Sequence, residues 1–74
     1  MAELEQLVVG DRPINLTQVL KLSGWVMHGA EAKTLISEGR IRVNGDTEYR
    51  KRRQMAIGDT VFLEDGPSLV LVRD

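Results

Sequence analysis

The chain has 74 residues, a formal net charge of −1 and no cysteine. This length accommodates one domain, and the lack of cysteine excludes disulfide bonds and thiolate ligands for zinc. Because the apolar runs are too short for a transmembrane helix or a signal peptide, we expect a cytoplasmic protein with no membrane partner.

The first predicted elements are a strand and a helix. Residues 4–9 are rich in leucine and valine and predict an edge strand. Pro13 cannot donate a ladder hydrogen bond, so we expect the strand pairing to end there. Residues 16–23 place apolar side chains three and four positions apart, which predicts a helix. Asn15 and Gln18 fit the reciprocal cap that begins such helices.

A second amphipathic helix is predicted over residues 30–38, after which the hydrophobic period changes from 3.6 to 2. Residues 40–43 alternate arginine with a β-branched residue and predict a strand whose apolar side chains point inward. The dipeptide Asn44-Gly45 favours a type I′ hairpin turn, which leads into a return strand over 46–50.

Two more strands are predicted near the end of the chain, over residues 60–63 and 69–72, each after a glycine-containing turn. Together the elements predict an α+β fold in which two short helices pack on a small antiparallel β-sheet. We expect one domain over residues 1–74.

The residues that could support catalysis are sparse. His28 is the only histidine, and no glycine-rich loop of the Walker or dinucleotide type is present. No pair of carboxylates stands in helical register within an apolar segment, as acid–base catalysis would need. We therefore expect a protein that is not an enzyme, with no catalytic residue, no metal and no cofactor.

The basic residues are concentrated in the middle of the chain, where eight of the ten lie between positions 21 and 58. The densest run is residues 50–53, whose mutual repulsion is costly unless an anion or solvent screens it. Lys33 is expected near the start of the second helix, where backbone N–H groups favour an anion. This pattern predicts a polyanion-binding face, with a solvated charged surface as the alternative.

Three ring side chains have two interpretations each. Trp25 is either a core anchor or a platform for a stacked base. Tyr49, on the predicted return strand, either stacks on a nucleotide or pairs across the sheet. His28 either contacts a phosphate or lies in an exposed loop.

The stretch from Ser23 to Gly45 closely resembles the alpha-L RNA-binding motif, the domain named after small-subunit ribosomal protein S-four. The later pair Gly58-Asp59 resembles the glycine–aspartate pair that this family has before its next strand. The matching positions within the stretch are Gly24, Glu31, Ala32, Lys33, Leu35, Ile36, Gly39, Ile41, Val43, Asn44 and Gly45.

The resemblance implies a helix–loop–helix backed by a small sheet, with a motif core at about residues 15–61 and RNA held against the helices and the hairpin. The chain departs from the family at His28-Gly29, where serine and arginine are frequent, so one expected phosphate contact is either weakened or replaced by His28. The expected RNA-binding residues are Lys21, His28, Lys33, Arg40, Arg42, Arg50, Lys51, Arg52 and Arg53.

We therefore expect a non-catalytic module, similar to the small stand-alone bacterial members of the family, that binds structured RNA through its phosphates. Structured RNA is favoured over free single strands because few aromatic side chains are available to stack on bases. Ribosomal RNA and transfer RNA are the expected partners. The alternative, suggested by the acidic chain ends, is a protein-interaction adaptor in a ribosome-assembly or nucleic-acid-processing complex. Duplex DNA is a weaker candidate, since no segment offers a long recognition helix.

Overall fold

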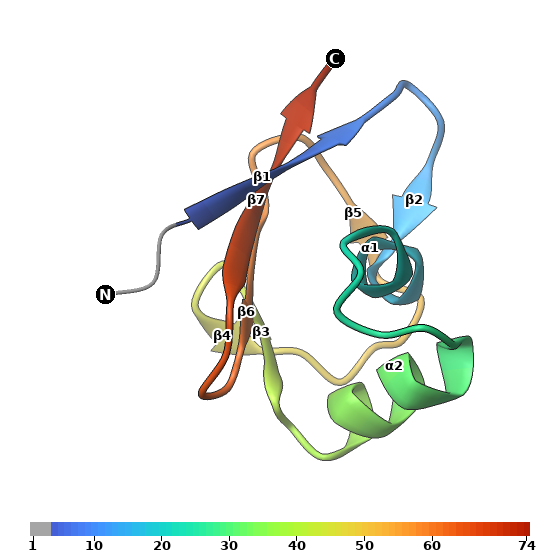
Figure 1. The fold of residues 1–74 in the computed structure, drawn as a ribbon, viewed down its shortest axis with the longest axis vertical. Coiled ribbons are helices and arrows are strands. Elements are labelled where there is room, and N and C mark those ends of the chain that lie inside the picture. The colour runs from blue at the N-terminus through green and yellow to red at the C-terminus, as the bar shows by residue number, and fades with distance from the viewer. Residues whose placement is uncertain (1–3) are drawn as a thin grey trace.

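The computed structural model describes residues 4–74 and combines short helices with short strands (Figure 1). The α+β class is confirmed, and each predicted helix agrees with the observed one to within a residue at both ends. In chain order the elements are β1 (Leu4–Val9), β2 (Ile14–Asn15), α1 (Leu16–Leu22), α2 (Gly29–Ser37), β3 (Ile41–Val43), β4 (Asp46–Thr47), β5 (Gln54–Met55), β6 (Thr60–Leu63) and β7 (Ser68–Arg73).

The main sheet has five strands in the order β1-β7-β6-β3-β4, and β2 pairs with β5 in a separate two-stranded sheet. Within the five-stranded main sheet, neighbouring strands are antiparallel except at one edge, where β1 runs parallel to β7. The prediction of a wholly antiparallel sheet is therefore wrong at this edge, and the sheet is mixed. A parallel pair needs a long crossover, and the rest of the chain, including both helices, separates these two strands.

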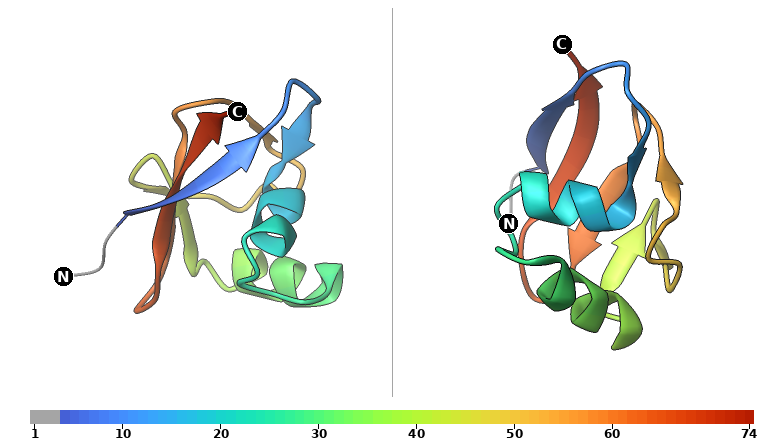
Figure 2. Two further views of the ribbon diagram at one scale, coloured as in Figure 1. Left: turned by 45° about the horizontal axis from the view of Figure 1, so that its top comes forward. Right: turned by 90° about the vertical axis from the view of Figure 1, so that its right-hand side faces the viewer.

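Both helices pack on the same face of the main sheet (Figure 2). Pro13 does not end the strand pairing as expected, because β2 follows it directly and pairs with β5. No helix of the described residues is long and apolar enough to cross a membrane. The fully buried larger side chains between helices and sheet are Leu16, Val19, Leu20, Ile36, Ile41, Val61, Leu69 and Leu71.

The predicted cap of the first helix, the glycine that follows this helix and the predicted hairpin turn are confirmed. The Asn15 side chain accepts the Gln18 N–H at 2.9 Å, and the Gln18 side chain accepts the Asn15 N–H at 2.9 Å. Gly24 ends the turn after α1 with a φ of 80°. Asn44 and Gly45 both have positive φ, 53° and 91°, as a type I′ turn requires.

The return strand is shorter than expected, because β4 ends at Thr47. Glu48 still donates its N–H to the carbonyl of Ile41 at 3.0 Å, and the chain then turns away from β3, with the Arg50 N–H donating to the Glu48 carboxylate at 3.0 Å. Tyr49 consequently lies outside the strands, so of its two interpretations the pairing across the sheet is wrong and the stacking on a nucleotide stays a prediction. Its hydroxyl lies 2.9 Å from the position that a Cβ would occupy on Gly39, whose φ is 74°, so a side chain there would be both strained and crowded.

Candidate nucleic-acid interface

The basic loop of residues 48–53 is fixed to the beginning of α1. The N–H of Leu16 donates to the carbonyl of Arg53 at 3.0 Å, and the N–H of Thr17 donates to the carbonyl of Lys51 at 3.2 Å. The Thr17 hydroxyl donates to that same Lys51 carbonyl at 2.8 Å. The first N–H groups of a helix lack acceptors within the helix. Here carbonyl groups of the basic loop are the acceptors for two of them.

This docking brings basic side chains from the loop and from α2 to one surface. Lys33 of α2 lines a depression of about 370 Å³ with Lys51 and Arg52 of the loop. All three cations are exposed, and within residues 4–74 none of them forms an ion pair. We call this depression the three-cation site. Its remaining lining residues, which the sequence did not single out as site residues, are Asn15, Thr17 and Gln18.

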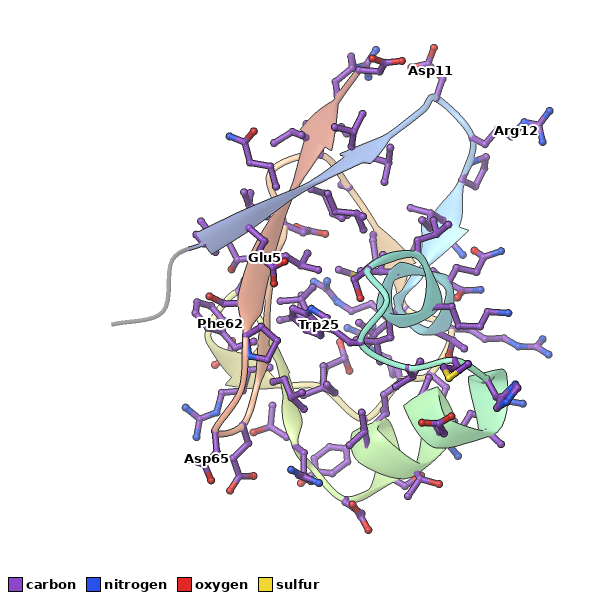
Figure 3. The ribbon with its side chains drawn as sticks, viewed as in Figure 1. Glu5, Asp11, Arg12, Trp25, Phe62 and Asp65 are labelled. Atoms are coloured by element: carbon purple, nitrogen blue, oxygen red, sulfur yellow. The ribbon has the colours of Figure 1, made fainter. Side chains whose placement is uncertain are left out.

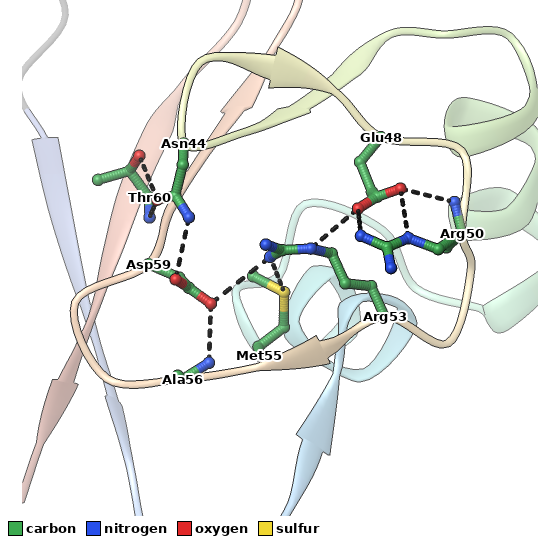
Figure 4. Close-up of polar contacts among 8 residues, drawn as sticks. All are labelled: Asn44, Glu48, Arg50, Arg53, Met55, Ala56, Asp59 and Thr60. Carbon is green, nitrogen blue, oxygen red and sulfur yellow. Dashed lines mark hydrogen bonds and ion pairs between the residues drawn. The ribbon is translucent and has the colours of Figure 1, made fainter.

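The other two cations of the loop are held by carboxylates (Figure 4). The Arg53 guanidinium lies 2.9 Å from the Glu48 carboxylate and 3.5 Å from that of Asp59, and its side chain is only 23% exposed. Arg50 also pairs with Glu48, at 2.8 Å, but its side chain is 72% exposed. Arg53 thus helps to hold the loop in place, while Arg50 keeps much of its surface available to solvent.

The same network extends to the hairpin turn. The Asp59 carboxylate accepts the side-chain amide of Asn44 at 3.0 Å and the N–H of Ala56 at 2.8 Å. The side-chain oxygen of Asn44 in turn accepts the N–H of Thr60 at 2.9 Å. Figure 4 shows Arg53 joining this cluster to Glu48. The asparagine of the hairpin and the aspartate before β6 are therefore structural partners of the basic loop.

The pKa of Glu48 lies well below its ordinary value because of the arginines around it. Hydrogen bonds from the Arg50 side chain lower the pKa of Glu48 from 4.5 to about 2, against the opposing effect of desolvation, and the charge of Arg53 adds to the lowering. Reciprocally, the Glu48 carboxylate raises the pKa of Arg50.

Replacing this carboxylate should change the acid stability of the protein. A folded pKa below the unfolded one gives stability that is present above the unfolded value and lost as the pH falls toward the folded value. We expect Glu48→Gln to be less stable than the wild type near neutral pH and to lose less stability between about pH 5 and about pH 2. Urea unfolding across that range measures this. The control is Glu64→Gln, at an exposed carboxylate without an ion pair in residues 4–74, and equal pH profiles for both variants would contradict the assignment.

The strand arginines lie apart from the three-cation site. Arg42 is on the face of the sheet turned away from the helices, because its neighbours Ile41 and Val43 are buried in the core. It lines a different depression, together with Phe62, Glu64 and Asp65. Arg40 precedes β3 and lies 4.0 Å from the Glu38 carboxylate. The structure therefore does not gather all the expected basic residues on one patch, and an RNA contact by either strand arginine stays a prediction.

The remaining predicted residues lie on the helices or in the link between them. Lys21 is exposed on α1 and lines a groove that shares Gln18 with the three-cation site. His28 is the N-cap residue of α2 and is exposed, without a side-chain capping hydrogen bond. Trp25 is half-buried against the hydrophobic core, which confirms its interpretation as a core anchor. Its indole N–H is buried and has no hydrogen-bond partner among the described residues.

Metal binding has no evident site in the part of the chain that the structure describes. Within residues 4–74 there is no group of three or more histidine, aspartate or glutamate side chains placed to hold an ion. The three-cation site has the opposite chemistry, because its amide, ammonium and guanidinium groups can donate hydrogen bonds to an anion.

Comparison with known proteins gives consistent matches over most of the chain. The "Putative RNA-binding protein YbcJ" of Escherichia coli strain K12 is 44% identical over 54 residues, which cover 72% of this chain and 77% of that protein. The "Probable ribosome maturation protein RlbA" of Bacillus subtilis strain 168 is 36% identical over 59 residues, or 80% of this chain and 83% of that one.

The solution structure of Escherichia coli YbcJ, described as having an alfaL motif involved in RNA-binding, is similar to this structure with a TM-score of 0.72. The two share 38% identity, and the match covers 97% of this chain and 91% of the other. The expected alpha-L fold is thereby confirmed. The model of the S4 domain family matches residues 7–71, and the chain therefore belongs to the S4 domain family.

Proposed function

We propose that this protein is a non-catalytic RNA-binding module, which holds structured ribosomal or transfer RNA against the three-cation site. The observation that carries the proposal is the convergence of Lys33, Lys51 and Arg52 around one depression with no carboxylate in its lining. The names of the relatives support the same function, since one is a putative RNA-binding protein and another a probable ribosome maturation protein.

The chemistry of the site favours backbone phosphates. Arg52 can donate two parallel hydrogen bonds to a phosphate, and the two lysines act as point charges beside it. Thr17 and Gln18 add neutral polar groups at the same surface. No aromatic residue lines the site, so stacking on successive bases is not its mode of binding. Contacts of this kind set the position of a folded RNA and leave its sequence largely unread.

The proposal predicts a salt-dependent affinity for folded RNA. Each neutralised phosphate contributes a slope of about −0.7 to −0.9 to the plot of log affinity against log salt concentration, so three cations should give roughly −2 to −3. We expect this slope for a structured ribosomal RNA fragment, and weaker binding to a DNA duplex of matched length. Fluorescence anisotropy over a salt series measures both. Absence of RNA binding at low salt would overturn the proposed function.

A protein-interaction adaptor remains the second candidate, and one feature of the surface favours it. Within residues 4–74 no helix covers the outer face of the main sheet (Figure 2), where Phe62 is 41% exposed. An adaptor that uses this face would keep its partner after ribonuclease treatment and lose it in a Phe62→Ser variant. An RNA-binding module would lose its partners on ribonuclease treatment, and the Phe62→Ser substitution would leave its RNA affinity unchanged.

A further inference from the structure

A second depression, of about 420 Å³, lies between the end of β1, the loop that follows it, and α1. Its apolar walls come from Val8, Pro13, Ile14 and Leu22. Leu22, at the end of α1, is 63% exposed although its side chain is wholly apolar. We call this depression the apolar groove. An apolar hollow with a few polar groups at its edge is the usual form of a small-ligand site.

The polar groups at the edge of the apolar groove are basic. Arg12 and Lys21 both line it, no carboxylate does, and neither cation forms an ion pair within residues 4–74. The nearby carboxylate of Asp11 is engaged by Arg73 at 3.0 Å. Figure 3 shows Asp11 and Arg12 leaving the β1–β2 loop in different directions. The edge of the groove therefore suits a ligand that is apolar on its faces and joined to negative charge.

One residue connects the apolar groove with the three-cation site. Gln18 lines both depressions. Its side-chain oxygen accepts the Asn15 N–H in the helix cap, which fixes the amide orientation and leaves the Nε2 group as the donor available to a ligand. A chain of phosphates that passes Lys33, Lys51 and Arg52 can thus continue past Gln18 toward Lys21 and Arg12.

We infer that the apolar groove binds one unpaired RNA base, next to a paired segment held at the three-cation site. This inference rests on the proposed function and adds to it the kind of RNA that is preferred, a stem interrupted by an unpaired nucleotide. A base turned out of its stack has two apolar faces and a polar edge, and proteins hold such bases between apolar side chains. Here the aliphatic walls would cover the faces, Gln18 would donate to the edge, and the two basic side chains would pair with the flanking phosphates.

The test compares two RNA hairpins that differ only in one bulged purine, replaced by fluorescent 2-aminopurine for a direct signal. We expect the wild type to bind the bulged hairpin at least about fivefold more tightly than the fully paired one, because burying about 40 Å² of apolar base surface at about 25 cal/mol per Å² contributes about 1 kcal/mol. Binding should also change the emission of the bulged base. Leu22→Ser should abolish both the preference and the emission change, with the affinity for the paired hairpin kept within about twofold.

The matched control is Met27→Ser, at an apolar residue that is 81% exposed and lies in neither depression, which should keep the preference. Equal affinity of the wild type for the two hairpins would overturn the inference and leave the proposed function standing. So would a Leu22→Ser variant that still discriminates between them, or one that loses affinity for both alike. Failure of the wild type to bind either hairpin would instead overturn the proposed function. Arg12→Ala gives an independent check. It removes one of the two basic side chains at the edge of the groove and should reduce the preference for the bulged hairpin, and because Arg12 is exposed the hydrophobic core is unchanged.

Discussion

Replacing Lys33, Lys51 and Arg52 together with glutamate is expected to weaken the binding of structured RNA by roughly a thousandfold. A hydrogen bond to a charged group contributes at least about 1.5 kcal/mol, so losing three costs about 4.5 kcal/mol, and each 1.4 kcal/mol is a tenfold change in affinity. The salt slope should fall by about 2 to 3 at the same time. All three side chains are exposed and form no ion pair within residues 4–74, so the fold should tolerate the change.

The control for this experiment is Arg42→Glu, which reverses a charge that the sequence also predicts as an RNA contact. Arg42 lies on the far face of the sheet beside Glu64 and Asp65, so we expect its reversal to change the RNA affinity by less than about threefold, as for a distant exposed charge. Circular dichroism and thermal unfolding confirm that each variant is folded. An equal loss for Arg42→Glu and for the triple variant would move the interface away from the three-cation site.

The parts of the structure that follow from neighbouring residues could be predicted from the sequence. The reciprocal cap of α1 needs only Asn15 and Gln18, three positions apart, and the hairpin turn needs only Asn44 and Gly45. Such local preferences agree with the global fold in natural sequences. The alternation that placed Ile41 and Val43 in the core is equally local, and the structure confirms it.

The parts that depend on distant residues could not be predicted. Arg52 and Arg53 are neighbours of the same type, yet one is exposed at the three-cation site while the other is enclosed by Glu48 and Asp59. The difference arises because residues 51–53 dock on α1 through backbone hydrogen bonds from Leu16 and Thr17, which a run of basic letters does not encode. The composition of the run therefore showed that charge is concentrated, but not which charges remain accessible.

This difference between two adjacent arginines leads to a second large effect, now on stability. We expect Arg53→Ala to lower the free energy of unfolding by about 1–3 kcal/mol, because it leaves Glu48 and Asp59 without a shared cation. For a domain of this size that is a fall in melting temperature of about 4–8 °C for each kcal/mol. Arg52→Ala should stay within about 0.5 kcal/mol of the wild type, as exposed substitutions usually do.

Urea unfolding followed by the fluorescence of Trp25, the only tryptophan, measures both variants. A double-mutant cycle with Glu48→Ala then separates the ion pair from simple loss of packing: residues in contact show a coupling energy of at least about 0.5 kcal/mol, and the cycle between Arg52 and Glu48 should show none. Equal destabilisation by the two arginine variants would mean that the basic loop is not held by the Glu48 and Asp59 carboxylates.

If Arg53 anchors the loop, Arg53→Ala should also weaken RNA binding, because it releases Lys51 and Arg52 from α1. This decrease in RNA affinity should be larger at temperatures close to the melting temperature of the variant. The decrease in RNA affinity of Arg52→Ala should instead depend on the salt concentration and not on temperature.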